Sequence, residues 1–576
     1  MTDQRNLLLA ILLSIAILLG FQFLYEIPRM EQRQAEVARQ QATEQTLPQP
    51  GAPLAPGAVP GAAAPGAPLD REGVVSATAE NRIRIDTPRL HGSISATGGR
   101  IDDLTLADYH VTVEPGSPEI VLLSPPRAPN PYYAEFGWVG GEGTTVPLPG
   151  PDTAWNVEGG PLTPDSPITM RWDNGQGLVF EKTISVDRNF MFTVTQRVFN
   201  RSGETVRLFP YGFVSRQGTP ETSGYYILHE GPLGVVDGRL QEIDYEDLET
   251  GAPVENDTVG GWIGITDKYW LVSLVPPQDE AVETRFLRSA RDGQDRYQVD
   301  TLGTVKEVAP GGSTEYTTRL FAGAKQVRLL DAYAEQYGIT NFDRAIDFGW
   351  FYFLTKPFFY ALDFLGRLFG NFGVAILVFT VFVKLVFFPL ANKSYRAMSK
   401  MKALQPEMVK IRERYGNDRE RMSQEIMALY KREKANPVSG CLPILIQIPV
   451  FFALYKVLFV TIEMRHAPFF GWIQDLSAPD PTSVFNLFGL IPWDTPAMLT
   501  IGVWPIIMGI TMYLQQKLNP APPDPIQARV FMALPFVFTF MLASFPAGLV
   551  IYWAWNNTLS ILQQWVIMRR MGVKVT

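Results

Sequence analysis

The feature that most constrains the fold of this chain is a lysine inside an apolar run. Lys384 lies within 374–389, where nearly every neighbour is aliphatic or aromatic. Such a run predicts a helix that crosses a bilayer, because helices and closed barrels alone satisfy their backbone hydrogen bonds in hydrocarbon. A lysine near the helix centre costs roughly 2.5–3.5 kcal/mol on insertion, so it usually faces protein or water and indicates function. Snorkelling towards the nearer surface is the alternative, since Leu390 follows six residues later.

Apolar segments elsewhere predict further membrane spans. Residues 7–25 are apolar, follow Arg5 and lack a small-x-small cleavage site, so we expect an uncleaved anchor and not a signal peptide. With this anchor the sequence predicts a membrane α-helical protein with six transmembrane helices and a five-helix core. The five later candidate spans are 372–390, 442–460, 497–515, 530–545 and 546–567.

The charges between these segments predict their orientation. Residues 392–436 contain 12 Lys or Arg and 6 acidic residues, and basic residues also follow the last span. Residues 461–496 contain four acidic residues and one arginine. Because cytoplasmic loops are enriched in Lys and Arg, we expect 392–436 and both termini to be cytoplasmic.

The basic segment 392–436 also has a helical pattern. Its apolar residues are spaced by three and four, and residues 416–418 interrupt them. This pattern predicts a cytoplasmic coiled-coil hairpin, whose basic faces suit anionic lipid, ribosomal RNA or an acidic factor. A solvated charged face without a partner is the alternative. The apolar residues are Met401, Leu404, Met408, Ile411 and Tyr415, then Met422, Ile426 and Leu429.

The N-terminal half differs in composition. Residues 71–335 contain 38 acidic and 23 basic residues, whereas the whole chain has a net charge of −8. Short alternating runs separated by turn residues predict a large antiparallel β-sandwich, with a core strand pair at 262–275. We expect the acidic cluster at 244–249 to be a solvated loop. No motif in this region indicates a catalytic pocket.

Two connecting segments complete the predicted organisation. Residues 31–49 are polar and Gln-rich, and 50–68 are almost entirely Pro, Ala and Gly, which predicts an extended tether. Residues 342–353 place aromatic and acidic residues on different helical faces, which predicts an interfacial helix on the outer membrane surface.

Polar residues recur on several of the predicted spans. Thr380 is four residues before Lys384, and Gln447 lies in the next span. On the last span Tyr552 and Asn556 share one helical face with Gln563, and Trp553 begins a neighbouring polar row. These stripes predict a hydrated groove that would help a polar chain cross hydrocarbon. The predicted groove residues are Lys384, Thr380, Gln447, Tyr552, Trp553 and Asn556.

Other functional classes lack support in the sequence. The single cysteine, Cys441, forms no internal disulfide, and the four histidines lack metal-ligand spacing. No P-loop, GxSxG or HExxH pattern occurs, so we expect no catalytic residue, metal or cofactor. A solute transporter usually has internal repeats, which we do not find. A passive scaffold for the β-sandwich would not need a charge inside a span.

Four motifs give the chain a resemblance to a known family. They resemble the YidC/Oxa/Alb insertases, and the order of anchor, large extracytoplasmic domain and five-helix core is similar to the Gram-negative type. The match spans essentially the whole chain and is most specific in 340–570. The motifs are NKSYRAMSKMKALQP at 392–406, SQEIMALY at 423–430, NPVSGCLPILIQIP at 436–449 and FPAGLVIY at 545–552.

The resemblance implies several properties. Lys384 takes the place of a groove cation that is often arginine, and it lacks the planar fork for bidentate capture of a carboxylate. Thr380 matches a groove threonine, and Tyr552 and Trp553 match an aromatic pair. The implied location is the bacterial inner (plasma) membrane. The implied partners are nascent membrane proteins, the Sec translocon, the lipid bilayer and, through the hairpin, the ribosome and the signal recognition particle pathway. No small-molecule substrate is implied, and the implied β domain is a mutarotase-like sandwich.

The predicted boundaries follow these changes in composition. The segments are an anchor at 1–26, a linker at 27–70, a periplasmic β-sandwich at 71–340, an interfacial helix and second span at 341–391, the hairpin at 392–436, spans three to six at 437–568 and a basic tail at 569–576.

Overall fold

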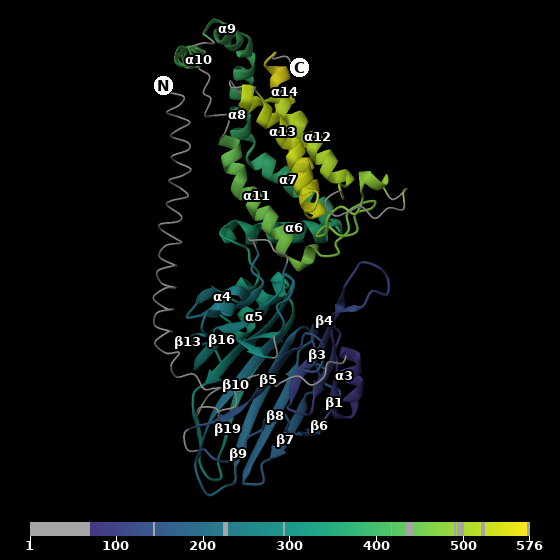
Figure 1. Cartoon of the computed structure of the whole chain (residues 1–576), viewed down its shortest axis with the longest axis vertical. Helices are drawn as coiled ribbons and strands as arrows, with labels where there is room; N and C mark the ends of the chain where they lie inside the picture. The colour runs from purple at the N-terminus through teal and green to yellow at the C-terminus, as the bar shows by residue number, and fades with distance from the viewer. Residues whose placement is uncertain are drawn as a thin grey trace. The chain divides into compact units, whose positions relative to one another are not determined.

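The structure is a computed structural model with two compact units, one ending at Asp347 and the other beginning at Phe348 (Figure 1). The predicted anchor at 1–26, nearly all of the linker, Cys441 and the last four residues lie outside the described residues. The described residues are 70–141, 144–222, 228–291, 294–415, 418–433, 442–488, 491, 500–519 and 525–572.

The N-terminal unit is the predicted antiparallel β-sandwich. One sheet has the order β1-β2-β3-β5-β10-β17-β16-β13, with β4 beside β3 and β18 beside β10. These strands are β1 (Arg82–Asp86), β2 (Leu90–Ser95), β3 (Arg100–His110), β4 (Glu119–Leu123), β5 (Tyr132–Gly140), β10 (Val206–Gln217), β13 (Val254–Val259), β16 (Ala281–Arg291), β17 (Gln294–Gly303) and β18 (Lys306–Val308).

The second sheet has the order β12-β11-β14-β15-β19-β9-β8-β7-β6. Alternate residues of β8 and β9 are buried, as the alternating sequence predicts for strands with one face in a core. The strands are β6 (Asn156–Glu158), β7 (Ile168–Asp173), β8 (Leu178–Val186), β9 (Met191–Asn200), β11 (Gly231–Val236), β12 (Arg239–Glu242), β14 (Trp262–Thr266), β15 (Trp270–Val275) and β19 (Ser313–Ala324).

The strand pair predicted at 262–275 is confirmed. Strands β14 and β15 pair antiparallel, with Ile263 opposite Leu274. The indole of Trp262 is buried and contacts Phe342 edge to face, with ring centroids 5.4 Å apart. Short helices complete this unit: α3 (Arg71–Ala77), η3 (Ala79–Asn81), α4 (Tyr245–Thr250), α5 (Val327–Tyr337) and η4 (Phe342–Ala345).

Two local predictions in this region are wrong. The acidic residues at 244–249 are exposed as predicted, but the segment is not a loop. Tyr245 and Leu248 are buried one turn apart and hold the helix α4 against the sandwich. The interfacial helix predicted at 342–353 does not form over that range. Phe342 belongs to the core of the sandwich, and Gly349 has a φ of +70°, which ends any continuous helix there.

Lys182 of β8 is buried in the sandwich. Its Nζ donates hydrogen bonds to the carbonyl oxygens of Phe136 (2.8 Å) and Gly99 (3.2 Å). Burial lowers the pKa of Lys182 to about 8, an effect that the nearby Glu135 carboxylate opposes. Glu135 itself forms an ion pair of 2.7 Å with Arg100. Lys182 is therefore a cation held mainly by backbone carbonyls.

The second unit consists of helices. In Figure 1, α6 lies across one end of the bundle, and α9 and α10 lie beyond the other. The helices are α6 (Tyr352–Phe369), α7 (Phe372–Val386), α8 (Phe388–Ala403), α9 (Gln405–Tyr415), α10 (Arg419–Arg432), α11 (Leu442–Val460), α12 (Val503–Leu518), α13 (Pro525–Leu542) and α14 (Ala547–Arg570), with short η6 (Ile462–Met464) and η7 (Val484–Asn486) turns.

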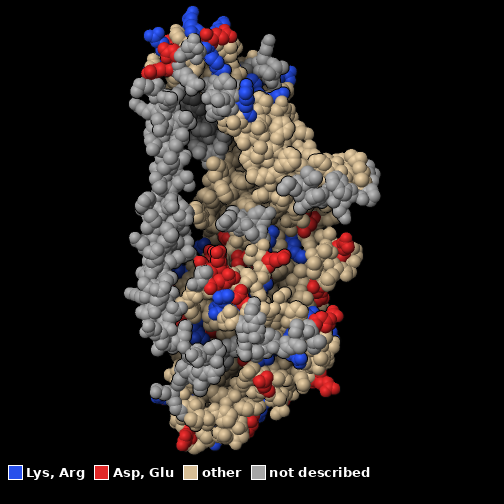
Figure 2. All heavy atoms as spheres, viewed as in Figure 1, with Lys and Arg blue, Asp and Glu red and all other residues tan. Residues whose placement is uncertain are grey.

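Among the described residues, no helix by itself has the length and apolar character of a span, although α7 and α8 together do, with a bend of 71°. On the visible face, charged residues of both signs gather at the α9–α10 end, and the surface over the bundle consists mainly of uncharged residues (Figure 2).

Helices α9 and α10 pack against each other as an antiparallel pair. Met408, Ile426 and Leu429 form its buried core. Leu404, Ile411, Met422 and Tyr430 pack around them. The structure therefore brings together six of the eight apolar residues whose spacing predicted one common face. Met401 belongs instead to α8, and Tyr415 is not part of the cluster.

Candidate functional site

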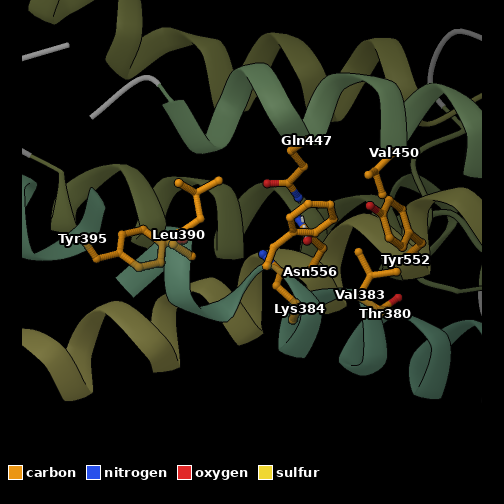
Figure 3. Close-up of a pocket in the computed structure, with 11 residues that line it drawn as sticks. Thr380, Val383, Lys384, Leu390, Tyr395, Gln447, Val450, Tyr552 and Asn556 are labelled. Carbon is orange, nitrogen blue, oxygen red and sulfur yellow. Dashed lines mark hydrogen bonds between the residues drawn. The ribbon is translucent and has the colours of Figure 1, made fainter. Parts of the chain in front are cut away.

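A pocket opens between α7, α8, α11 and α14, and we call it the groove. Lys384, Gln447 and Asn556 lie at its middle, with Tyr395 towards one end and Thr380 and Tyr552 towards the other (Figure 3). The full lining is Thr380, Val383, Lys384, Phe387, Leu390, Ala391, Tyr395, Gln447, Val450, Tyr552 and Asn556.

The bend between α7 and α8 shapes the groove. The sequence predicted one continuous span over 372–390, but α7 ends at Val386 and α8 starts at Phe388. Pro389 is in the first turn of α8, and a proline lacks the N–H that would continue the α7 hydrogen bonds. The bend therefore leaves Lys384 in the last turn of α7 and places Tyr395 of α8 on the same groove.

Helix α14 supplies one wall. Tyr552, Asn556 and Ser560 follow one another at intervals of four residues and share a helical face. The indole nitrogen of Trp555 donates to the Leu377 carbonyl oxygen at 3.1 Å, which ties α14 to α7. This bond helps to hold the polar face of α14 opposite Lys384.

The polar side chains in the groove form a hydrogen-bonded set. Lys384 Nζ donates to Ser560 Oγ at 2.7 Å, and Gln447 Nε2 donates to Asn556 Oδ1 at 2.7 Å. Thr380 instead donates to the Ile376 carbonyl oxygen of its own helix at 2.6 Å. The threonine oxygen therefore faces the groove as an acceptor.

The groove has one formal charge among its lining residues. That charge belongs to Lys384, and no Asp or Glu is among the lining side chains. Its hydrogen-bond partner, the Ser560 hydroxyl, is neutral, so the ammonium is not neutralised by an ion pair there. An anionic group that enters the groove would therefore meet an uncompensated cation.

Two family models together match nearly the whole chain from the first strand onwards. The YidC periplasmic domain matches residues 82–361, and the 60Kd inner membrane protein matches residues 364–574. The membrane protein insertase YidC of Methylorubrum extorquens is 55% identical over 599 residues, covering 100% of this chain and 96% of that protein. This chain belongs to the YidC family of membrane protein insertases. The YidC of Rhizobium meliloti is 54% identical over 580 residues, and the alignment covers 100% of this chain and 97% of the Rhizobium protein.

A solved structure of an active YidC insertase aligns with 84% of this chain and 92% of its own, at 17% identity and a TM-score of 0.35. Family membership rests on the curated YidC relatives and the two family models.

The structure places five of the six predicted groove residues in the groove lining, and Trp553 is not among them. Trp553 points instead to a cluster with Met508, Leu542 and Val550. The helical period explains this difference. Consecutive side chains of an α-helix point about 100° apart, so Trp553 faces away from the groove when Tyr552 faces it.

Sequence reasoning missed Tyr395 and Ser560. Ser560 could have been found, because it continues the four-residue spacing of Tyr552 and Asn556. Tyr395 had no such signal, since it lies beyond Pro389 and reaches the groove through the bend between α7 and α8.

Proposed function

We propose that this chain inserts hydrophobic segments of nascent membrane proteins into the bacterial inner membrane by admitting their polar tails to the groove. The uncompensated ammonium of Lys384 in a groove open between helices is the observation that carries the proposal. Gln447, Thr380, Tyr552 and Asn556 would supply hydrogen-bonding groups beside it.

Solvation explains how such a groove would act. A polar tail that crosses hydrocarbon leaves groups unsatisfied, and each costs several kcal/mol. A hydrated groove with a fixed cation lowers that barrier, most strongly for an acidic tail. The apolar segment of the substrate then partitions sideways into lipid because of its own hydrophobicity. Partitioning supplies the driving force, so no nucleotide or other cofactor is needed and no bond is cleaved.

The membrane topology is part of the proposal. Six spans with both termini in the cytoplasm would place the α9–α10 hairpin in the cytoplasm and the β-sandwich in the periplasm. The positive balance of 392–436 and the acidic balance of 461–496 support this orientation. The uncharged surface over the bundle in Figure 2 is of the kind that lipid would cover.

We propose partners from the same charge distribution. The basic hairpin would contact the ribosome, the signal recognition particle pathway or anionic lipid, and the chain would work alone or beside the Sec translocon. Exposed cations include Lys410, Arg414 and Arg421, which lie on the hairpin away from its apolar core.

The test uses proteoliposomes that contain only this protein. A single-span substrate with an acidic N-terminal tail is added, and its protease-protected fragment is quantified. We expect protection with wild type and Lys384→Arg, a loss with Lys384→Ala and the largest loss with Lys384→Glu. Lys393→Ala, which removes an exposed lysine of α8 outside the groove lining, is the matched control.

Each outcome has a defined meaning. Protection equal to that of empty liposomes would remove the insertase proposal and favour a scaffold for the β-sandwich. Protection that does not change with Lys384 would leave insertion in place and assign the lysine to snorkelling.

A further inference from the structure

Ser560 is a buried residue that touches the groove cation without lining the groove. It lies in α14, one turn beyond Asn556, and is 1% exposed. Its hydroxyl is the hydrogen-bond partner of Lys384, at 2.7 Å. A buried hydroxyl beside the ammonium of a flexible lysine side chain can fix the position of that ammonium.

The hydrogen bonds of Ser560 are fully assigned by its geometry. Its hydroxyl proton goes to the Asn556 carbonyl oxygen, 2.8 Å away in the preceding turn. A hydroxyl has one proton and two lone pairs. Oγ therefore meets Lys384 as an acceptor.

This hydrogen bond joins α7 to α14, and α8 contributes a further side chain to the same groove. Lys384 comes from α7, Tyr395 from α8 and Ser560 from α14. Tyr395 is 8% exposed and lies towards one end of the groove in Figure 3. The bend between α7 and α8 brings the lysine and the tyrosine to the same groove.

We propose that Ser560 is the positioning residue of the groove, fixing the depth at which the Lys384 ammonium meets an acidic group of the substrate. The proposal rests on the proposed function. Without this acceptor, the flexible lysine stem is free to carry its ammonium towards the nearer membrane surface. The cation would then be present but spread over a range of depths, and preorganisation would be lost.

Ser560 suits this role because it is neutral. An acidic partner would form an ion pair with Lys384 and compete with the substrate carboxylate. A hydroxyl fixes the ammonium while leaving its charge available. Thr keeps the hydroxyl, and Val has nearly the same shape without it, so Ser560→Thr and Ser560→Val form a matched pair.

The test measures insertion in proteoliposomes of the full chain. Substrates carry one aspartate at successive tail positions, and a tail without acidic residues is the control. With wild type and Ser560→Thr, we expect a sharp optimum of aspartate position. With Ser560→Val, we expect the rate at that optimum to fall about tenfold, as for the loss of one hydrogen bond to a charged group. Insertion of the uncharged tail should remain equal in all three.

A second measurement separates positioning from general damage. In the Lys384→Ala background, the Ser560→Val substitution should have no further effect on acidic tails, because there is no cation left to position. If Ser560→Thr and Ser560→Val insert substrates with the same rate and the same optimum of aspartate position, Ser560 has no positioning role. The same conclusion follows if Ser560→Val slows the insertion of acidic tails as much in the Lys384→Ala background as in wild type. Failure of wild type to insert any substrate would instead overturn the proposed function itself.

Discussion

Gln447 Nε2 donates a 2.7 Å hydrogen bond to Asn556 Oδ1, and this bond joins α11 to α14 across the groove. The two residues are 109 positions apart in the chain. Tyr552, one turn before Asn556 on α14, lines the same groove as Gln447. The polar side chains of the groove therefore also link the helices that form it.

We expect Gln447 and Asn556 to be energetically coupled. Gln447→Leu and Asn556→Leu should each destabilise the protein, and the double variant should lose about 0.6 kcal/mol less than their sum, a typical coupling in a membrane bundle. The measurement is unfolding by SDS in mixed micelles. Gln474→Leu, which removes an exposed amide, is the control. Full additivity would show that the bond adds no stability.

Substrate should contact Tyr552 and not its neighbour Trp553. Tyr552 lines the groove, whereas Trp553 packs with Met508 and Leu542. A photo-crosslinking residue at 552 should therefore give adducts with an inserting substrate, and the same residue at 553 should give adducts within the protein. Equal substrate adducts at both positions would contradict this assignment of faces.

The hairpin should depend on its small apolar core. Leu429 is 3% exposed, so Leu429→Ala should cost about 2–5 kcal/mol and reduce hydrogen-exchange protection in α9 and α10. Met427 lies two residues earlier and is 43% exposed, so Met427→Ala should change stability by less than about 0.5 kcal/mol. Similar protection in both variants would argue against a packed hairpin.

The stability of the β-sandwich should vary with pH through Lys182. Its pKa is lowered from 10.5 to about 8 by burial, so the folded state disfavours the charged form. The resulting penalty is complete below about pH 8 and disappears as the pH rises to 10.5, because the unfolded chain then also releases its proton. Wild type should thus gain up to about 3 kcal/mol relative to Lys182→Met across this range.

Urea unfolding of wild type and Lys182→Met at several pH values measures this difference. Other titrating groups, including the buried Lys325, are the same in both proteins and cancel in the comparison. A stability difference that stays constant from pH 8 to 10.5 would show that Lys182 keeps an ordinary pKa in the folded state.

Periodic sequence patterns predicted much of this structure. The alternation in 178–186 matches β8, and most of the apolar residues spaced by three and four in 404–429 form the core of the α9–α10 pair. Such patterns are local, because each residue's face follows from the period of its own helix or strand. Predictions failed where a contact with a residue distant in sequence determines the local structure. Phe342 is an example, because it packs on Trp262 in the β-sandwich.

The sequence by itself determined the class of protein, the position of its groove cation and the polar faces beside it, because hydropathy, charge and helical period are properties of short segments. Only the tertiary structure decided which residues of other helices these polar faces contact. The bend between α7 and α8 brings Tyr395 to the groove, and the packing of α14 on α7 places Ser560 at 2.7 Å from Lys384. These contacts arise between helices distant in sequence, where no local period specifies a partner.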